Sequence, residues 1–426
     1  MQVKNSSLCI FDRPATQTDF VRNQTVEYYP LTNVSAGGPI EFTIPGNSEE
    51  YIDVNDIQLY LTAKVTKSDG KDIEDTDKVG LNNLPIATLF QDVGLILGDT
   101  QIEGGNMCYP YLGYFSTVMQ FSPKAQESHM ICQGWCKDEA GKFESDKNRG
   151  FKYRSALIKE SRVFELMGPL FLNFFRQSQY LISQTDMRLK LIPSKPEFVL
   201  NAYGAVTDFK IQFQEVILYV NRCTLNPSVI NGHTAGMKRQ NAIYPILHSE
   251  VTTFTIPKGQ QSYVKDRLFP DLAPKMLMIS MVENTAFNGS IGKNPFHFQH
   301  FDLKKLCLYR DGVSVTGQAL SPNFDKGLVV RSYMQTMRTF NYYNTDDTNG
   351  LLPEEFANGY TIFAFDLTAD KEMSATHRQP ITSKNLRLEL TFEKDLPKTV
   401  NVLLYAVYDS EIEITQMRDI ITHYTR

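Results

Sequence analysis

The stretch that decides the fold is Phe90-Gln-Asp-Val-Gly-Leu-Ile-Leu-Gly-Asp99, because it returns as Phe301-Asp-Leu-Lys-Lys-Leu-Cys-Leu-Tyr-Arg-Asp311. In both copies apolar residues recur at alternating positions up to a turn of Gly and Asp, and a second alternating segment follows at Thr100 or Val313. Alternation with a period of two residues is typical of a β-strand, and two such strands around a short glycine turn predict a hairpin. We therefore expect the same hairpin in each half of the chain.

Two further segments recur in the same order along the chain. Phe42-Thr-Ile-Pro-Gly46 returns as Phe254-Thr-Ile-Pro-Lys-Gly259, and Arg188-Leu-Lys-Leu191 returns as Arg387-Leu-Glu-Leu390. The three repeats have offsets of 212, 211 and 199 residues, close to half of the 426-residue chain, and this spacing predicts a tandem duplication. The expected superposition covers residues 27–222 and 241–415, with Phe42 over Phe254 and Leu95 over Leu306.

The segment between the repeats divides the chain into domains. Residues 224–236 are rich in turn formers and follow neither the strand nor the helix period, which is typical of a linker. We predict a first domain at residues 1–222, a linker at 223–240 and a second domain at 241–426. A chain of this length can form a sizeable core in each of them.

The composition favours strands and turns. The chain has 27 Phe and 21 Tyr beside 25 Gly and 20 Pro, and aromatic residues are enriched in strands whereas Gly and Pro form turns. Helical spacing of apolar residues is confined to residues 111–120 and 329–340. Many short strands without interleaved helices predict an all-β fold of sandwich or jelly-roll type with a few short helices in loops, and a barrel is the alternative.

The charge balance does not suggest a nucleic acid or an anionic membrane as the obvious partner. The chain has 43 Lys+Arg against 48 Asp+Glu, which gives a formal net charge of −5. The most apolar window, residues 164–175, contains Glu165 and is shorter than the roughly 20 residues of a membrane helix. We therefore expect no membrane span.

The start of the chain and the cysteines predict the place of synthesis. Residues 1–12 contain no continuous apolar region of the kind that a secretion signal needs, so we expect the mature chain to begin near Met1. Sparse cysteines predict reduced thiols and synthesis inside the cell, in the cytoplasm. The six are Cys9, Cys108, Cys132, Cys136, Cys223 and Cys307.

Possible metal ligands occur in three places. His129, Cys132 and Cys136 supply three soft ligands, but a structural zinc needs four, so free thiols are the favoured interpretation and a redox-formed bridge is an alternative. His297 and His300 would face opposite sides of a strand. Residues 345–350, Thr-Asp-Asp-Thr-Asn-Gly, resemble a calcium loop but lack its first Asp and its final Glu, so we expect a solvated turn. No metal site is predicted.

Catalytic signals are equally weak. The sequence has no Gly-x-Ser-x-Gly elbow, phosphate-binding glycine loop or His-Glu-x-x-His helix. Neighbouring carboxylates, Glu49 with Glu50 and Glu354 with Glu355, would point apart on a strand. We therefore expect no enzyme, and no catalytic or cofactor-binding residue.

One mixed-charge stretch offers a possible phosphate contact. Its basic residues surround two aromatic side chains, an arrangement that can bind nucleic acid, but acidic residues lie among them. The basic residues are Lys147, Arg149, Lys152, Arg154 and Lys159, and the aromatic residues are Phe151 and Tyr153.

A set of strand and turn motifs extends along most of the chain. The motifs are Phe42–Gly46, Cys108-Tyr-Pro-Tyr-Leu-Gly-Tyr114, Tyr244–Glu250, Phe254–Gly259, Asn288–Phe298, Gly359–Thr368 and Thr399–Asp409. None of them contains a catalytic signature. In order and extent they resemble the motifs of the major capsid proteins of Polinton (Maverick) elements and the related adintoviruses.

This resemblance implies a tandem double jelly roll, that is, two eight-stranded antiparallel β-sandwiches side by side. It also implies a homotrimer that forms a pseudo-hexagonal capsomer of an icosahedral virion capsid around double-stranded DNA. Neighbouring capsomers, penton proteins and minor capsid proteins would be the partners. Up to Pro30 the charges of the N-terminal segment balance, so sequence-specific DNA binding is not expected. A β-sandwich carbohydrate-binding module is the main alternative, and a hydrolase on a jelly-roll scaffold is a weaker one.

Polar segments and chain ends predict the contacts between copies. Residues 137–162 and 341–355 are long and polar, so we expect exposed loops there. Residues 1–29 and 411–426 lie outside the expected repeats and would reach neighbouring subunits, becoming ordered on contact. Deletion of residues 1–21 is then expected to leave a folded trimer but to weaken association between capsomers.

Overall fold

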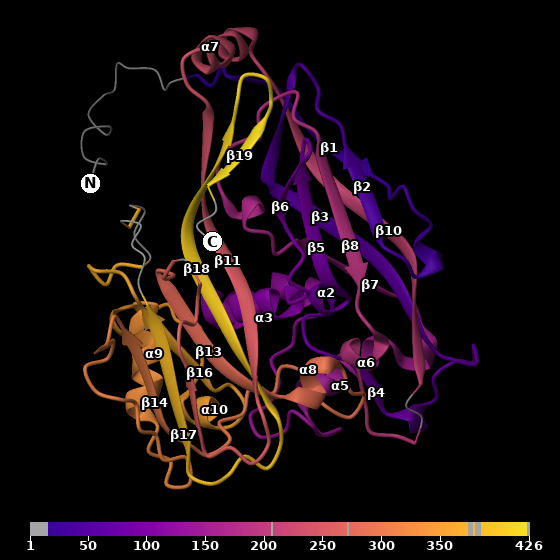
Figure 1. Ribbon diagram of the computed structural model, residues 1–426. Coiled ribbons are helices and arrows are strands. Elements are labelled where there is room, and N and C mark those ends of the chain that lie inside the picture. Colours follow the sequence, from indigo (N-terminus) through magenta and orange to yellow (C-terminus); the bar gives the residue numbers. More distant parts are fainter. Residues whose placement is uncertain (1–15, 206–207, 271, 374–377, 380–384, 424–426) are drawn as a thin grey trace, which may run out of the picture.

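The computed structural model describes residues 16–205, 208–270, 272–373, 378–379 and 385–423. Two β-sandwiches lie side by side, one built from the first half of the chain and one from the second (Figure 1). Strands of both sandwiches pair in the antiparallel sense throughout their main sheets. Antiparallel strands with one apolar face are what the alternating sequence pattern dictates.

The first sandwich consists of two four-stranded sheets. In the outer sheet the order is β1 (Phe20–Tyr28), β10 (Phe209–Leu225), β3 (Glu50–Lys67) and β7 (Phe164–Pro169). In the other sheet it is β2 (Ile40–Ile44), β8 (Met187–Pro193), β5 (Phe90–Leu97) and β6 (Thr100–Glu103). A short pair, β4 (Val79–Leu81) with β9 (Leu200–Ala202), lies beside them.

The second sandwich repeats this plan. One sheet has the order β11 (Ala242–Ile256), β18 (Val400–Ile414), β13 (Met276–Glu283) and β16 (Ile362–Asp366), and β19 (Ile420–His423) pairs with β18. Its other sheet has the order β12 (Ser262–Lys265), β17 (Leu386–Phe392), β14 (Leu303–Arg310) and β15 (Val313–Ser314).

The two sandwiches share one topology. When β4, β9 and β19 are set aside and the other strands are counted from one to eight in each half, both halves have sheets of order 1-8-3-6 and 2-7-4-5. This order is that of a jelly roll, in which hairpin-related strands alternate between two sheets. The prediction of an all-β fold with two eight-stranded antiparallel sandwiches is therefore confirmed.

Strand alternation explains how each sandwich forms its core. In β3, Leu59, Leu61 and Ala63 are buried, whereas Tyr60 and Thr62 between them are partly exposed. Full burial of a leucine contributes about 1.5–3 kcal/mol, so the row of inward side chains holds the sheet against its partner. A shift of the strand by one residue would expose this row and bury the polar one.

The structure supports some of the expected repeat pairs and overturns another. Leu95 lies on β5 and Leu306 on β14, which are the fourth strands of their sandwiches. Phe42 lies on β2, a second strand, whereas Phe254 lies on β11, a first strand, so their expected superposition is wrong. The shared sequence Phe-Thr-Ile-Pro fits the end of any strand that is followed by a turn. Such a short local pattern therefore does not show which strand of the sandwich it belongs to. The residue boundaries of the domains stay a prediction.

Helices occur between the strands. The two predicted from apolar spacing are α3 (Tyr109–Gln120) and α9 (Val330–Thr339). The expected linker contains a third, α7 (Pro227–Met237), which begins after Asn226, whose side chain accepts a hydrogen bond from the Ser228 amide. Pro at the first position and an Asn cap stabilise this helix start, a signal that the turn-rich composition obscured. The remaining helices are α2 (Pro85–Thr88), α4 (Pro123–Gln126), α5 (Arg149–Leu157), α6 (Pro196–Val199), α8 (Asn284–Asn288) and α10 (Pro353–Ala357). No described helix is long and apolar enough to cross a membrane.

The expected free ends of the chain are partly strands. Residues 20–28 form β1, the edge strand of the first sandwich, and residues 411–414 and 420–423 belong to β18 and β19. The prediction that residues 1–29 and 411–426 lie outside the sandwiches is therefore wrong for these strands. An edge strand with exposed side chains lacks the apolar alternation that marks a half-buried strand. Residues 1–15 and 424–426 lie outside the described residues.

Candidate functional site

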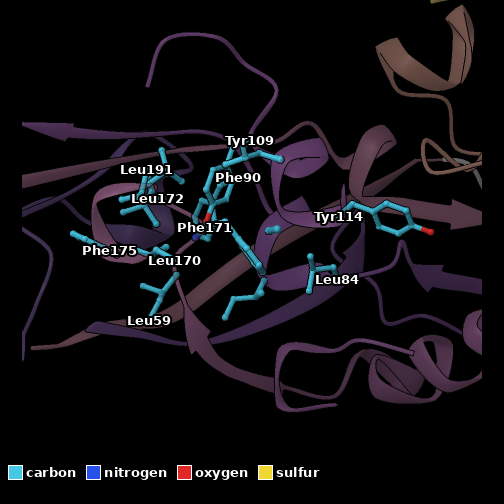
Figure 2. Close-up of a cluster of buried hydrophobic side chains, with 14 of the residues drawn as sticks. Leu59, Leu84, Phe90, Tyr109, Tyr114, Leu170, Phe171, Leu172, Phe175 and Leu191 are labelled. Atoms are coloured by element: carbon cyan, nitrogen blue, oxygen red, sulfur yellow. The ribbon is translucent and has the colours of Figure 1, made fainter. Parts of the chain in front are cut away.

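Helix α3 joins the two sandwiches. It is buried along almost its whole length, and it lies between the sheets of the first sandwich and strands β11 and β18 of the second (Figure 1). Gly113 permits this packing, because a Cβ atom there would lie 3.0 Å from the Cβ atom of Ala87. In Figure 2 the buried cluster extends from Leu191 and Leu59 through Phe90 and Tyr109 to Tyr114 of α3.

Aromatic rings from both halves stack at this helix. The ring of Tyr114 stacks on Phe296 with 4.1 Å between centroids, and the ring of Phe115 stacks on Phe298 at 5.0 Å. Phe115 also contacts Tyr405 of β18, with 5.6 Å between centroids. Aromatic pairs contribute about 0.5–1.5 kcal/mol each beyond the area that they bury. The junction is therefore continuous with the core of the first sandwich.

The segment expected as a polar surface loop, residues 137–162, supports this junction. Arg154 pairs with Asp138 at 2.7 Å, and both side chains are at most 1% exposed. Asn148 also donates to the Asp138 carboxylate, at 2.9 Å, and the backbone carbonyl of Asp138 accepts the Tyr360 hydroxyl of the second half at 2.8 Å. The surface-loop prediction is therefore wrong for Asp138, Asn148 and Arg154, which bind one another in the interior, whereas other charged residues of the segment, such as Lys142 and Lys147, are exposed.

Further ion pairs cross between the halves. Lys137 Nζ lies 2.7 Å from Glu355 Oε2, and Lys293 Nζ lies 2.9 Å from Glu144 Oε2. His297 stacks on Phe143 and its Nδ1 atom lies 3.6 Å from Glu144. Burial favours the neutral form of Glu144, but the nearby His297 and the hydrogen bond from Lys293 outweigh this effect and lower the pKa of the carboxyl.

A buried carboxylate organises a second crossing. Glu103 accepts hydrogen bonds from the Phe174 amide at 2.7 Å, from the Asn173 amide at 2.8 Å and from the Asn173 side chain at 2.9 Å. Asn173 in turn exchanges two hydrogen bonds with the backbone of Ser249 in β11. Burial raises the pKa of Glu103. This chain of bonds links β6 to β11 of the second sandwich.

A cavity of about 740 Å³ opens at one side of the junction. Its wall includes Asn173, Arg176, Lys275 and Asp409. Lys275 pairs with Asp409 at 2.9 Å, and both side chains are largely buried, so these charges are already compensated. The cavity belongs to the seam between the sandwiches.

The soft side chains that the sequence analysis considered as zinc ligands do not form a close group among the described residues. His129 and Cys132 lie on a 3-10 helix, His129–Gln133, where Cys132 is exposed, and Cys136 is half-buried with a raised pKa caused by burial. Within the described ranges, the three-residue group with ligand atoms close together is Glu411, Glu413 and His423. Arg378 pairs with Glu411, and Glu413 binds both Asn241 and His423.

The other histidines and carboxylates considered in the sequence analysis do not form a common site. His300 stacks on Phe324 at 4.0 Å, and burial lowers its pKa, whereas His297 faces Glu144. Residues 345–350 include the buried Asn349, whose side chain accepts from the Leu351 amide. Glu50 pairs with Arg222 at 3.1 Å, and Glu49 lies in the turn before β3. Glu354 and Glu355 lie in the first turn of α10, where Glu355 is paired with Lys137.

The mixed-charge stretch does not present one basic surface. Arg154 is buried on Asp138, and Phe151 is buried beside Tyr203, with 5.0 Å between ring centroids. Lys159 pairs with Asp75 at 3.3 Å, and Lys147, Arg149 and Lys152 are exposed. The arrangement favours a structural role for this segment over a phosphate contact. The sequence signal for the buried Asp138–Arg154 pair is the mixture of opposite charges with Phe and Tyr in this stretch.

Known proteins share this architecture over its full length. No protein-family model matches the sequence. An uncharacterized protein of Caenorhabditis elegans is 24% identical over 423 residues, which are 95% of this chain and 98% of that protein. A chain of the Sputnik virophage superposes with a TM-score of 0.66 and 12% identity, over 100% of this chain and 92% of that one.

Two further solved structures agree. A chain of the PBCV-1 virus capsid has a TM-score of 0.62 and 12% identity, over 98% of this chain and 100% of that one. The mavirus major capsid protein has a TM-score of 0.54 and 10% identity, over 100% of this chain and 93% of that one. The fold is the tandem double jelly roll. In this chain, α3 and the segment 137–162 hold the two jelly rolls of that fold together.

Proposed function

We propose that this chain is the major capsid protein of an icosahedral, double-stranded DNA virus or virus-like element. Its two sandwiches of identical strand order, joined by a buried junction, are the single observation that carries the proposal. A catalytic site needs groups brought together in a cleft, whereas the buried charged residues of this junction bind one another. A structural subunit is what such an arrangement serves.

Duplication gives the subunit a suitable shape for a shell. A trimer of a doubled domain presents six similar walls, so an object with threefold symmetry can pack like a hexagon. We propose that three copies form such a capsomer, that capsomers tile the capsid with penton and minor capsid proteins, and that the shell encloses DNA without reading its sequence. The net charge of −5 supports the last point, because tight genome binding requires a strongly basic surface.

The motifs that resemble Polinton and adintovirus capsid proteins support a place in that lineage. The strand segments concerned include Tyr244–Glu250 on β11 and Thr399–Asp409, which covers the first ten residues of β18 and the residue before it. We accordingly propose synthesis in the host cytoplasm and residence in the virion.

Mass and shape in solution test this function. The full chain is purified and examined by size-exclusion chromatography with light scattering, and then by negative-stain electron microscopy. A stable particle of three chain masses with a hexagonal outline is expected. A carbohydrate-binding module would instead be a monomer that binds a glycan array, and a monomer at all concentrations without hexagonal particles would contradict the capsid proposal.

A further inference from the structure

One sheet of the second sandwich is covered on its outer face within the chain. The outward residues Met278 of β13 and Leu403 and Tyr405 of β18 are buried in the same cluster as α3. Phe115 of α3 contacts Tyr405, and Asn173 binds the backbone of Ser249. The sheet β11–β18–β13–β16 therefore packs against the connection between β6 and β7 of the first sandwich.

The equivalent sheet of the first sandwich is uncovered. Along the outer face of β1–β10–β3–β7, Met167, Tyr60 and Ile217 are direct cross-strand neighbours. Tyr219 lies beside Tyr60, with 6.5 Å between ring centroids, and Tyr29 follows at the edge. Met167 is 37% and Tyr29 58% exposed, Tyr60 and Tyr219 are partly exposed, and Ile217 is buried. An apolar row on an exposed sheet face is unusual for a surface that stays in water.

Acidic side chains surround this row. Glu27 is the cross-strand neighbour of Tyr219, and Glu165 and Glu215 are both neighbours of Thr62. All three glutamates are exposed, and no ion pair is formed by any of them within the described part of the chain. We call this surface, made of Glu27, Tyr29, Tyr60, Glu165, Met167, Glu215 and Tyr219, the acidic tyrosine face.

Helix α9 is the counterpart of α3 in the second sandwich. Both helices lie in the connection between the fifth and sixth strands, which are β6 and β7 around α3 and β15 and β16 around α9. One side of α9 is held by β16, where the Thr336 hydroxyl donates to the Ile362 carbonyl at 2.8 Å and the Thr339 hydroxyl to the Ala364 carbonyl at 2.9 Å. The opposite side of α9 is exposed.

The exposed side of α9 is apolar and basic. Val330 is 60% and Met334 36% exposed, one helical turn apart, and Arg331 and Arg338 flank them. Arg331 donates to two backbone carbonyls, and Arg338 lies over the Tyr343 ring. Neither arginine pairs with a carboxylate among the residues whose positions are described. This side therefore complements the acidic tyrosine face in both polarity and charge.

The two surfaces lie on opposite flanks of the molecule (Figure 1), so they cannot meet within one chain. A contact between unlike surfaces of identical chains is heterologous and forms a closed ring when the rotation allows it. Three chains of two sandwiches each would then repeat, between copies, the contact that α3 makes within the chain.

We propose that the acidic tyrosine face binds the exposed side of α9 from a second copy of this chain, and that this contact closes the trimer. The inference rests on the proposed capsid function, and it adds the residues that meet. Glu165 and Glu215 pair with Arg331 and Arg338 of the neighbour, around a core of Tyr60, Met167, Val330 and Met334.

A charge exchange tests the contact. The face variant is E165K with E215K, the helix variant is R331E with R338E, and a third protein carries all four substitutions. Like charges across an interface cost several kcal/mol, so each double variant is expected to raise the concentration for half-dissociation of the trimer by at least about tenfold. The protein with all four substitutions restores opposite charges across the contact. Its concentration for half-dissociation is expected to return to within about threefold of that of the unmodified protein.

Mass by light scattering and the thermal transition by circular dichroism are measured for every protein. E197K on the exposed side of α6 is the matched control, with trimer and transition unchanged. The proposed contact is contradicted if the double variants stay trimeric. It is also contradicted if they dissociate and the protein with all four substitutions does not form the trimer again. In both cases a trimer of the unmodified chain would leave the capsid proposal standing. A monomeric unmodified chain would contradict the capsid proposal itself.

Discussion

The ring of Phe296 lies parallel to the ring of Tyr114, with 4.1 Å between centroids and 6° between planes. Tyr114 belongs to α3 of the first half, whereas Phe296 follows α8 in the second half, and both side chains are fully buried. A contact this close between residues far apart in the sequence requires both jelly rolls to be folded and docked. The two halves are therefore expected to unfold as one cooperative unit.

Replacement of either ring tests this coupling. Phe296→Ala is expected to lower the free energy of unfolding by about 3–5 kcal/mol, because it removes a buried ring and leaves a cavity at the junction. Urea denaturation is followed by circular dichroism, which reports on both halves, and by fluorescence of the single Trp135, which lies in the first half. Coincident transitions are expected for the unmodified chain, and separate transitions would show that the halves unfold independently.

Tyr111→Phe is the matched control at the same helix. The Tyr111 ring stacks on Phe287 at 5.6 Å, but its buried hydroxyl has no hydrogen-bond partner among the described residues. Removal of a buried hydroxyl without a partner is expected to be neutral or stabilising. A loss of more than about 1 kcal/mol would mean that this hydroxyl binds a group such as a buried water molecule.

The buried Asp138–Arg154 pair predicts that one substitution greatly lowers the free energy of unfolding. Arg154→Met removes one charge and leaves Asp138 buried and uncompensated, which is expected to lower the free energy of unfolding by about 3–5 kcal/mol. Lys142→Ala is the control, because its pair with Glu139 at 2.6 Å is exposed and such pairs contribute about 0–1 kcal/mol. Chemical denaturation measures both. Equal effects would show that water reaches Asp138.

Glu144 predicts how stability depends on pH. Its pKa is lower in the folded chain than in the unfolded one, because His297 and Lys293 bind the charged form. The folded state thus takes up a proton less readily, so this contribution is present above the unfolded pKa and is lost as the pH falls through the folded pKa. Between about pH 5 and about pH 3, Glu144→Gln is expected to show a shallower loss of unfolding free energy than the unmodified chain. Glu197→Gln is the control, and an unchanged slope in Glu144→Gln would contradict the prediction.

Truncations test the role of β1. Deletion of residues 1–15 removes no residue that the structure describes, so a folded trimer is expected. Deletion of residues 1–28 removes β1 and the hydrogen bond of 2.7 Å from Arg222 to the Tyr28 hydroxyl, and it exposes the edge of β10. Aggregation or loss of the thermal transition is expected for the longer deletion, because an open strand edge recruits other chains. A stable trimer without β1 would show that this strand is dispensable.

Deletion of residues 1–21 removes only Phe20 and Val21 from β1, and its predicted effect on capsomer association stays a prediction.

Local patterns predicted the elements of this protein well. Alternation at Phe90–Leu97 and Leu303–Arg310 predicted two strands that occupy the same place in their sandwiches, and helical spacing predicted α3 and α9. Such periods depend only on which face of one element is buried, and this information is local to a short window. The same reasoning missed β1, since an exposed edge strand has no apolar period, and it matched Phe42 to the wrong strand.

The amino-acid sequence by itself determined the all-β class and the duplication, because side-chain alternation and repeat order are properties of the chain. Only the tertiary structure decided that Asp138 and Arg154 are buried, that Tyr114 meets Phe296, and that Tyr60 and Tyr219 lie on an uncovered face. The sequence around a charged or aromatic residue looks the same whether its side chain contacts water or another side chain. Its environment depends on segments that come together only when the two sandwiches dock, and that docking is a non-local consequence of burying apolar surface.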